Sequence, residues 1–438
     1  MKVINNSYLS PLKALPRYVE ANRFLKKSQW FSSLEITNLQ IKRLRKLIKY
    51  SYENVPYYHH ILRKRNLKPA DIKTIEDLKK IPILGKNEIN AYMKELISKS
   101  FPRKKLLPYS TGGSTGEPTK FMHDWDSLPW IEAANNRFFS WAGKKLFSKI
   151  ISISPPRAGI IKTARRFKRE KSLTIFGGNE ERIEEVIKII KKEKPAGIKG
   201  YASSLGYLAD FILKSETKDI KLKFVISSSE VLTKETRKTI EEAFNCRVFD
   251  NYGSREFAIG GECQEHRGFH IAAENLVVEF VDLNKNESVT DGEAGEIIIT
   301  DLTRYGMPLI RYRIGDIGVF SSEERCHCGR GLPLIKKLKG RVTEMIVTSQ
   351  GRHLPGVAIV TMIFKDLNIR QFKVIQEKVD SLKILIVKGK GFSKKDLDFI
   401  IESFKELDEN LSIKFEFLNE IPTSHTGKHL LVQSLIKR

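Results

Sequence analysis

The chain has 438 residues, 41% of them hydrophobic and 29% charged, so it is too apolar to be disordered and long enough for two or three domains. Its 77 lysines and arginines outnumber its 52 aspartates and glutamates, and the net charge of +25 attracts polyanions such as nucleic acid, an anionic membrane, ATP or coenzyme A. The charge does not select among these partners, because a general bias toward lysine would produce the same excess.

No segment of the sequence predicts secretion or a membrane span. The N-terminus MKVINNSYLS lacks an apolar core of signal-peptide length, and the longest apolar stretch, residues 354–364, contains Pro355 and is too short to cross a bilayer. We therefore expect a cytoplasmic protein. Four cysteines in a reducing compartment favour buried thiols, a nucleophile or metal ligands over disulfides. The sequence leaves the oligomeric state open, a homodimer included.

The elements predicted in the first three quarters of the chain change from helices to alternating strands and helices. Apolar residues recur at helical spacing between residues 35 and 52, and amphipathic patterns continue to about residue 99, so residues 1–99 are predicted to be mostly helical. Apolar strand-like runs then follow at residues 150–153, 224–227, 275–283 and 296–300. Helical stretches at residues 180–192 and 233–244 alternate with them, which predicts a large, multi-layered α/β domain over residues 1–340.

The last hundred residues predict a second, smaller domain. Strand-like runs at residues 372–377, 383–387 and 412–418 surround a helical pattern at 394–407, which predicts an α+β domain over residues 341–438. The sequence shows no internal repeats. The basic cluster KTARRFKREK at residues 162–171 is interpreted as a solvated loop or helix face.

Residues 109–120, YSTGGSTGEPTK, combine glycines with hydroxyl side chains and one lysine. Glycines allow backbone N–H groups to converge on an anion, hydroxyls add donors, and lysine adds charge, so the segment is a candidate phosphate cradle. The candidate phosphate-binding residues are Ser110, Thr111, Gly112, Gly113, Ser114, Thr115, Gly116 and Lys120. A flexible surface loop is the alternative. Neither a Walker motif nor GxGxxG is present.

The segment STGEPTK at 114–120 resembles the phosphate-binding signature of adenylate-forming enzymes, the superfamily of acyl-CoA synthetases, peptide-synthetase adenylation domains and luciferases. Further motifs of that superfamily follow in its order: DNYGSRE at 250–256, YRIGD at 312–316, GR at 340–341 and PTSHTGK at 422–428. YGSREF at 252–257, EC at 262–263 and VPYY at 55–58 resemble the shorter phenylacetate-CoA ligase branch and its relatives among capsular polysaccharide biosynthesis proteins. The resemblance implies a large N-terminal domain and a small mobile C-terminal lid.

The resemblance also implies roles for single residues. Tyr252 would offer its ring as an aromatic face for adenine, and Asn251 or Asp250 would be the partner of the adenine edge. Gly253 belongs to the same nucleotide-binding set. The nucleotide-binding set also includes Asp316, as acceptor for the ribose hydroxyls, and Arg341, against ribose or phosphate. Taken singly, Tyr252 also fits a core aromatic and Asp316 a turn residue.

Two further residues receive catalytic roles from the resemblance. Glu256 would hold Mg²⁺, a hard cation that prefers carboxylate and phosphate oxygens, although it also fits a helix first turn. Lys428 would stabilise charge on the attacked phosphate when the small domain closes. One departure concerns the hinge: members commonly carry aspartates after Gly-Arg, whereas this chain has Val342, Thr343 and Glu344, with Glu344 as the candidate pivot.

Three cysteines and one histidine are candidate ligands of a structural zinc ion, which the resemblance to phenylacetate-CoA ligases favours. Cys263 and His266 form a C-x₂-H pair, and Cys326 and Cys328 form a C-x-C pair about sixty residues later. Three thiolates and one imidazole close a tetrahedral zinc site. His270 and His327 are alternatives for the fourth ligand, and four unrelated residues are the alternative to any site. Cys246 is expected to pack in a core.

The resemblance implies a reaction in two steps. ATP and a carboxylic acid give an acyl adenylate and pyrophosphate, and the acyl group then passes to a thiol, expected to be that of coenzyme A. Transfer to an amine or sugar acceptor in surface polysaccharide biosynthesis is the alternative. A scaffold without catalysis and a nucleic-acid-binding protein are less favoured, because the lysine motif at 426–428 is intact and the sequence contains no nucleic-acid-binding module.

Overall fold

A computed structural model describes residues 11–110, 119–145, 147–153, 170–173, 180–215, 217, 220–283, 285, 287–321, 326–365, 367–421 and 430–436. The chain divides into two compact units, which are treated separately below. Among the described residues, the second unit contains Gly315–Gly318 and the chain from Leu338 onward, and the first unit contains the others. The division after Lys337 lies close to the domain boundary predicted after residue 340.

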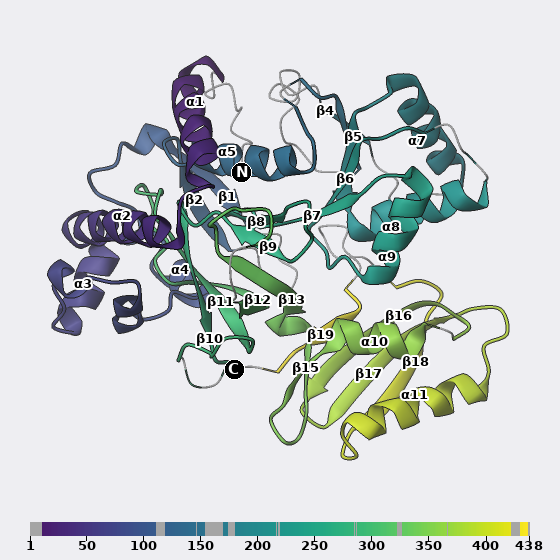
Figure 1. The fold of residues 1–438 in the computed structure, drawn as a ribbon. Coiled ribbons are helices and arrows are strands. Elements are labelled where there is room, and N and C mark those ends of the chain that lie inside the picture. The colour runs from purple at the N-terminus through teal and green to yellow at the C-terminus, as the bar shows by residue number, and fades with distance from the viewer. Residues whose placement is uncertain are drawn as a thin grey trace. The chain divides into compact units, whose positions relative to one another are not determined.

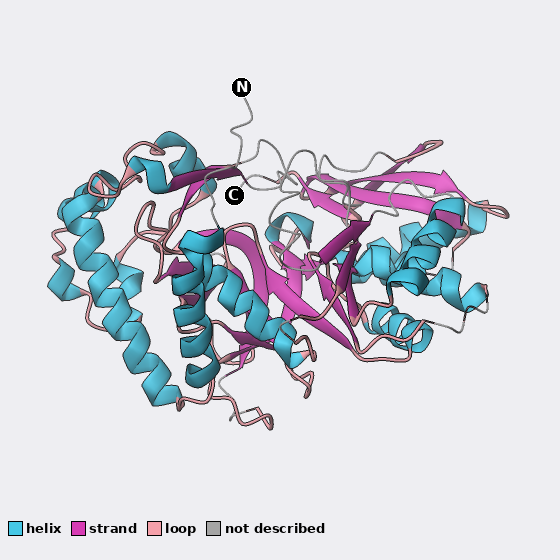
Figure 2. Cartoon of the chain, turned by 90° about the horizontal axis from the view of Figure 1, so that it is seen from above, coloured by secondary structure: helices cyan, strands magenta, loops and turns pink. Residues whose placement is uncertain are grey.

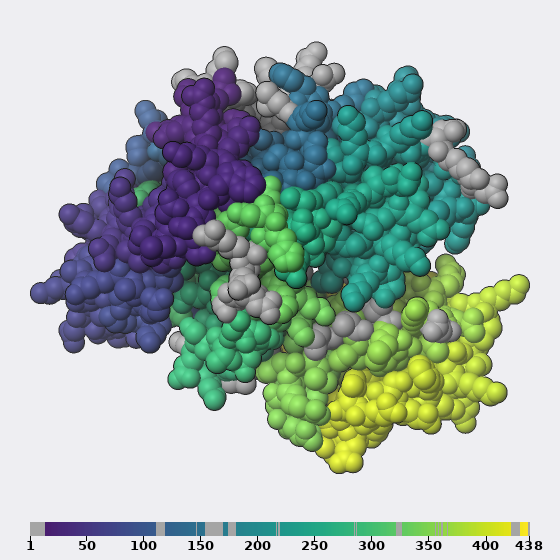
Figure 3. Space-filling model, viewed as in Figure 1, coloured from purple at the N-terminus to yellow at the C-terminus, as the bar shows by residue number. Residues whose placement is uncertain are grey.

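A helical layer opens the chain. Its helices are α1 (Pro11–Ser28), α2 (Ser33–Asn54), α3 (Pro56–Lys64) and α4 (Lys86–Ala91), with short 3₁₀ turns η1 (Pro69–Asp71), η2 (Glu76–Lys80) and η3 (Arg103–Lys105). Helix α2 begins at a capping box, because the Ser32 hydroxyl accepts from the N–H of Glu35 and the Glu35 carboxylate accepts from the N–H of Ser32. Its buried residues are mainly apolar, whereas lysines and arginines are among its exposed residues. The surface of the N-terminal helices is purple in Figure 3.

An eleven-stranded sheet forms the centre of the first unit, in the order β10-β11-β12-β13-β9-β8-β7-β6-β5-β3-β4. Its parallel half contains β3 (Ile150–Ile153), β4 (Glu170–Leu173), β5 (Gly197–Tyr201), β6 (Phe224–Ser228) and β7 (Val248–Gly253). Helices α7 (Glu180–Glu193), α8 (Ala202–Lys214) and α9 (Lys234–Phe244) connect these strands (Figure 1). The predicted α/β class is thereby confirmed.

Both faces of the parallel half are covered. On one face Ile151, Ile198 and Val225 pack into one cluster with the apolar sides of α7, α8 and α9. On the other face Phe224 and Ile226 pack with Ala142, just after helix α5 (Leu128–Trp141). Helices therefore flank the strands, as Figure 2 shows. Burial on two faces explains why these strands are almost continuously apolar in sequence.

The other half of the sheet has strands with antiparallel pairing. It contains β8 (Ala258–Glu262), β9 (Phe269–Ile271), β10 (Leu276–Val281), β11 (Ala294–Asp301), β12 (Tyr312–Ser321) and β13 (Leu334–Arg341). Strands β7, β8 and β9 pair antiparallel in succession, and β9 also pairs with β13. A separate hairpin of β1 (Leu106–Ser110) and β2 (Lys120–Asp124) precedes the sheet in sequence.

The second unit is a small α+β fold, coloured from light green to yellow in Figure 1. It contains β14 (Met345–Val347), β15 (His353–Pro355), α10 (Gly356–Phe364), β16 (Ile369–Lys378), β17 (Ser381–Lys388), α11 (Lys394–Leu407), β18 (Ser412–Phe417) and β19 (Val432–Ser434), with η4 at Val342–Glu344. Four strands form a sheet in the order β18-β17-β16-β19, and its apolar side packs with α10 and α11. None of the described helices combines the length and apolar character that a membrane span requires.

Candidate functional site

The β1–β2 hairpin holds both ends of the candidate phosphate loop. Ser110 ends β1, Lys120 begins β2, and the two residues are directly paired across the ladder. The two residues that border the candidate loop are thus held next to each other. Of the candidate loop residues, Thr111, Gly112, Gly113, Ser114, Thr115 and Gly116 lie outside the described residues.

A tight turn places Glu256 beside this hairpin. The Ser254 hydroxyl accepts hydrogen bonds from the N–H groups of Glu256 and Phe257, each at 3.2 Å, and the Ser254 N–H donates to the Phe257 carbonyl at 3.0 Å. The Arg255 guanidinium donates to the carbonyl oxygen of Ser110 at 2.8 Å. This last contact ties the segment that carries Glu256 to the strand end from which the loop departs.

Glu256 is a buried carboxylate held from several sides. Its side chain is almost inaccessible to solvent, and one carboxylate oxygen accepts from the hydroxyl of Tyr312 on β12 at 3.3 Å. Its backbone carbonyl accepts from the guanidinium of Arg304. Glu256 belongs to the turn between β7 and β8 rather than to a helix, so the alternative of a helix first-turn acid does not apply. A fixed carboxylate of this kind suits a hard cation.

The four candidate adenine-binding residues lie at the end of β7. Tyr252 is buried and packs edge-on against Phe269, with 6.0 Å between ring centroids. Asn251 is half-buried, its N–H donates to the Asp250 carboxylate at 3.1 Å, and its side-chain oxygen has no hydrogen-bond partner among the described residues. Gly253 is exposed and pairs with Ala258 at a register shift between β7 and β8.

A buried charge network supports this strand end. The carboxylate of Glu262 on β8 accepts from the N–H of Asp250 at 2.8 Å, from the Arg237 guanidinium at 2.8 and 2.9 Å, and lies 3.1 Å from Nδ1 of His266. Burial, and then the neighbouring Glu262 charge, raise the pKa of Asp250 to about 7. Burial opposes ionisation of Glu262 as well, but the His266 hydrogen bond and the Arg237 charge outweigh it and lower the pKa of that carboxyl.

Asp316 and Arg341, two predicted nucleotide contacts, form an ion pair in the second unit. The Arg341 Nε lies 3.2 Å from a carboxylate oxygen of Asp316, and both side chains are partly exposed. Asp316 lies within strand β12, directly after Gly315, whose φ of +81° only glycine adopts easily. The candidate pivot Glu344 accepts from the N–H of Arg341 at 3.2 Å and closes the short turn η4.

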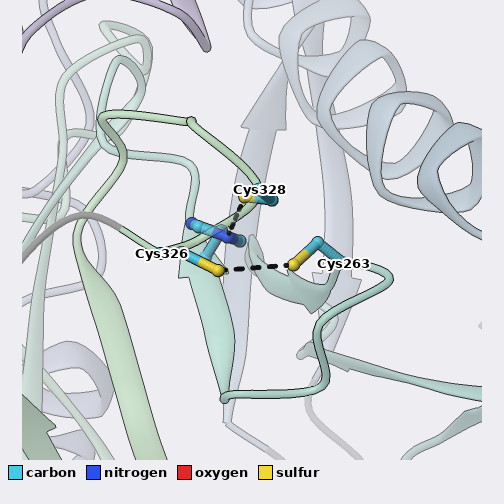
Figure 4. A group of neighbouring side chains, drawn as sticks. Cys263, Cys326 and Cys328 are labelled. Carbon is cyan, nitrogen blue, oxygen red and sulfur yellow. Dashed lines mark hydrogen bonds between the residues drawn. The ribbon is translucent and has the colours of Figure 1, made fainter.

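Three cysteines and one histidine converge in the first unit (Figure 4). Ligand atoms of Cys263, His270, Cys326 and Cys328 all lie within 4.8 Å of one another. The sulfurs of Cys263 and Cys326 are 3.7 Å apart, and the Cys328 sulfur is 3.3 Å from Nε2 of His270. Nδ1 of His270 lies 3.2 Å from the Leu332 carbonyl, so it carries the ring proton and leaves the Nε2 lone pair facing the sulfurs.

The structure corrects one predicted metal ligand. His270 completes the cysteine cluster, and His266 does not, because Nδ1 of His266 lies against the Glu262 carboxylate and the Arg237 guanidinium. His266 is in a turn with φ of +50°, whereas His270 is on β9, which pairs with β13 after the Cys326–Cys328 loop. His327 lies 3.3 Å from the Arg267 guanidinium. Cys246 is half-buried and packs against the α7–α9 core.

The catalytic candidate Lys428 lies outside the described residues, as does the rest of its motif. The structure adds four residues that sequence reasoning missed. His123, Arg304 and Tyr312 contact the segment that carries Glu256, and Arg255, within that segment, donates to the Ser110 carbonyl. Arg255 and Tyr312 stand inside motifs that the sequence analysis singled out. His123 and Arg304 have no such signal, since their contacts join residues more than forty positions apart.

Comparisons with known proteins show what the chain is similar to. A family model described as the CapK C-terminal domain matches residues 346–434. The chain is 26% identical over 327 residues to the phenylacetate-coenzyme A ligase of Thermus thermophilus, with 70% of this chain and 71% of that protein covered. It is 25% identical over 429 residues to Protein CapK of Staphylococcus aureus, with 92% and 90% covered.

Solved structures support the fold. A 2-hydroxyisobutyryl-CoA ligase in the postadenylation state superimposes with a TM-score of 0.72 at 18% identity, covering 92% of this chain and 90% of that chain. ATP-bound MatB from Rhodopseudomonas palustris gives 0.55 at 14% identity, with 74% and 66% covered. The predicted resemblance is confirmed: the chain is similar to the adenylate-forming enzymes, in the branch that includes phenylacetate-CoA ligases and CapK. The relatives also bear out the predicted class, an AMP-forming acid–thiol ligase.

Proposed function

We propose that this protein activates a carboxylic acid with ATP, releasing pyrophosphate and forming an acyl adenylate, and then transfers the acyl group to the thiol of coenzyme A. The observation that carries the proposal is the hydrogen bond from Arg255 to the Ser110 carbonyl. It joins a buried carboxylate segment to the end of the candidate phosphate loop, so a cation at Glu256 lies close to the place where phosphates would bind.

The proposed nucleotide site uses the residues at the end of β7. The side-chain oxygen of Asn251, unpartnered in the described part of the chain, is an acceptor for the amino group of adenine. Glu256 would hold Mg²⁺, which when bound neutralises charge on the phosphates. Asp316 would accept from the ribose hydroxyls, with Arg341 orienting its carboxylate through their ion pair. Lys428 would stabilise the charge that develops during attack by the acid.

Two acceptors are proposed in order of support. Phenylacetate-coenzyme A ligases of Thermus thermophilus and Pseudomonas putida are among the relatives, which favours coenzyme A and a carboxylic acid as substrates. Similarity to Protein CapK over 92% of the chain supports a second candidate, transfer to an amine or sugar acceptor in the synthesis of a surface polysaccharide. The motifs themselves serve the adenylation step, which both candidates share.

The first step is tested by acid-dependent exchange of labelled pyrophosphate into ATP. The panel comprises aryl acids, fatty acids, hydroxy acids, amino acids and uronic acids. We expect exchange with at least one class of acid, and the members of that class that support exchange identify the substrate. ATP binding without exchange across the panel would instead favour a scaffold that has lost catalysis, and duplex DNA binding that survives physiological salt would favour a nucleic-acid partner.

The second step is tested with the acid identified by exchange. Coenzyme A is expected to yield a thioester, detected by mass, together with stoichiometric AMP. If coenzyme A leaves the adenylate intact while an amine or amino sugar consumes it, the second candidate replaces the first.

We also propose a structural Zn²⁺ at Cys263, His270, Cys326 and Cys328. Three thiolates and one imidazole fit zinc, and four protein ligands leave no open position for catalysis. The hydrogen bond between His270 and the Leu332 carbonyl supplies the outer contact that orients a ligating imidazole. The ion would hold the loop before β13 against β9, stabilising this part of the sheet.

A further inference from the structure

Two consecutive backbone carbonyls at the candidate cation site are each held by a buried side chain. The carbonyl of Arg255 lies 2.9 Å from Nε2 of His123 on β2, and the carbonyl of Glu256 accepts from the Arg304 guanidinium. Both side chains are essentially inaccessible to solvent. These carbonyls belong to the two peptide groups on either side of the Glu256 Cα. Because both peptide groups are held, the direction in which the Glu256 side chain leaves the backbone is fixed.

The side chain of Arg304 is held in one conformation by its neighbours. Its guanidinium forms an ion pair with Asp301 at 3.2 Å and lies over two rings, 5.8 Å from the centroid of Phe121 and 5.4 Å from that of Phe257. Burying such an ion pair costs solvation free energy, and an apolar pair of the same size is often as stable. Stability alone therefore does not account for Arg304. Geometry accounts for Arg304, because its planar guanidinium contacts both Asp301 and the Glu256 carbonyl.

His123 acts as a neutral donor. Burial, with the nearby Arg304 charge, lowers the pKa of His123 to about 2, so the ring is uncharged at physiological pH. Since Nε2 faces a carbonyl, the ring proton is on Nε2. Tyr109 and Phe121 pack against the imidazole at 4.6 and 5.1 Å between centroids. The hairpin that holds the phosphate-loop ends thereby also holds the Glu256 backbone.

The turn that carries Arg304 is anchored to the same hairpin. The carboxylate of Asp124, which follows His123, accepts from the N–H groups of Tyr305 and Gly306 at 2.9 and 2.7 Å. A Cβ at Gly306 would lie 2.6 Å from a side-chain carbon of Leu106 and 2.9 Å from Cβ of Asp124, so only glycine allows this approach. One rigid frame thus links β1, β2 and the 301–306 turn around Glu256.

From this frame we infer that His123 and Arg304 are positioning residues for cation binding at Glu256: they hold the carboxylate in its metal-binding direction before Mg²⁺ and ATP arrive. The inference rests on the proposed function, because it takes Glu256 as the Mg²⁺ ligand. Neither residue is placed in contact with the metal or the nucleotide. Preorganisation of this kind lowers the entropy cost of forming the site.

The test measures ATP binding by calorimetry as a function of Mg²⁺, which needs no knowledge of the acid. His123→Leu and Arg304→Lys are each expected to raise the Mg²⁺ concentration for half-maximal ATP binding by about tenfold, the usual scale for losing an outer contact to a metal ligand. ATP binding in excess EDTA is expected to be unchanged. His123→Gln, which keeps an N–H donor, is expected to stay close to wild type.

Arg137 supplies a matched control for loss of stability. It is also buried, pairs with a carboxylate (Glu274, 2.6 Å), donates to a carbonyl (Leu25, 3.1 Å) and lies over two rings. Arg137→Lys is expected to lower the Tm much as Arg304→Lys does, without changing the Mg²⁺ dependence. Equal Mg²⁺ shifts in both variants would assign Arg304 a general structural role and overturn the inference.

A double-mutant cycle tests whether the two residues act through Glu256. In the Glu256→Gln background, adding His123→Leu or Arg304→Lys is expected to cause no further Mg²⁺ shift, and additive shifts would contradict the inference. The experiments also distinguish failure of the proposed function from failure of this inference. Wild-type protein that binds no ATP contradicts that function and this inference together, whereas wild-type Mg²⁺ dependence in folded variants contradicts the inference alone.

Discussion

Asp250 shows at the scale of one residue how a buried carboxyl in the candidate nucleotide site affects stability. Its folded-state pKa of about 7 lies above its ordinary value of 3.8, first because of burial and then because of Glu262. The folded state therefore binds this proton more tightly than the unfolded state. Stabilisation by the protonated form is complete below pH 3.8 and is lost as the pH rises through 7.

Asp250→Asn removes this titration. We expect the free energy of unfolding to fall less steeply between about pH 4 and 7 than in wild type, with a difference in slope of at most about 1.4 kcal/mol per pH unit. Urea unfolding at several pH values measures it. Asp398→Asn, at an exposed helix position, is the control and is expected to leave the slope unchanged. An identical pH profile in Asp250→Asn would mean that Asp250 is ionised throughout this range.

Asp316→Ala tests the proposed ribose contact. Removing a charged acceptor from two hydroxyl donors costs about 1.5–3 kcal/mol, so we expect the KM for ATP to rise roughly tenfold to a hundredfold. Pyrophosphate exchange at varied ATP measures it, with the exposed acid Glu287→Ala as control. An unchanged KM would show that the Asp316 carboxylate, on strand β12, serves its ion pair with Arg341 and does not contact the nucleotide.

Residue-scale prediction from the sequence succeeds where chemistry is concentrated in short motifs. Asp250 to Glu256 are brought to one strand end and its following turn because they are neighbours in the chain. His123 and Arg304 could not be found this way, since their partner carbonyls are 132 and 48 positions distant. Any carbonyl can accept their hydrogen bonds, so no residue type at the partner position marks the contact.

At the scale of elements, the choice between His266 and His270 depends on backbone geometry that spacing does not encode. Cys263 is followed by a turn in which His266 and Gly268 have positive φ, and the chain then re-enters the sheet as β9. The turn sends His266 toward Glu262, and the strand brings His270 to the cysteines. A C-x₂-H spacing fits many zinc sites, but here Glu262 competes for the nearer histidine.

The zinc content of purified variants tests which of the two histidines, His266 or His270, is the zinc ligand. His270→Ala and Cys326→Ser are each expected to reduce bound zinc below about a tenth of an equivalent, because a tetrahedral site with three protein ligands loses most of its affinity. His266→Ala and Cys246→Ser are expected to retain about one equivalent. Elemental analysis of purified protein measures zinc, and thiol titration counts the free cysteines. Zinc loss in His266→Ala with retention in His270→Ala would restore the spacing-based ligand set.

Helices and strands with a regular hydrophobic pattern agree with the prediction, whereas elements with a weak hydrophobic pattern do not. The predicted helix at 394–407 coincides with α11, and the predicted strands at 150–153 and 412–418 agree with β3 and β18 within one residue. Strand β8, AIGGE, has no strand pattern. Its Gly261 would place a Cβ 2.7 Å from Phe138 of α5, so close helix packing, not β-propensity, sets that sequence. Of the basic cluster, Lys171 lies in strand β4, contrary to a loop or helix, and pairs with Glu193.

At the scale of the whole molecule, the composition constrains less than the motifs do. A net charge of +25 is compatible with ATP and coenzyme A, both polyanions, and equally with partners that the relatives do not suggest. The order of the motifs along the chain carries the information that composition lacks. It places the candidate phosphate loop, the Glu256 turn and Asp316 before the second unit's core, and the lysine motif at that unit's end.

Lys428 tests whether the C-terminal domain takes part in one half-reaction or in both. The resemblance implies that Lys428 stabilises the negative charge on the attacked phosphate and the incoming carboxylate. This interaction is stronger in the transition state than in the ground state. Lys428→Ala is therefore expected to reduce kcat for adenylation by a factor on the order of a hundred or more, the scale of losing one oxyanion-type donor, with little change in the KM for ATP. Pyrophosphate exchange measures this step.

The same variant supplied with preformed acyl adenylate and coenzyme A is expected to form thioester at close to the wild-type rate, because no α-phosphate is attacked in that step. Lys390→Ala, an exposed lysine elsewhere in the second unit, controls for loss of charge. Full adenylation by Lys428→Ala would refute its role. Equal loss in both half-reactions would instead mean that one arrangement of the C-terminal domain serves both steps, since a residue needed only for attack on phosphorus cannot slow thioester formation.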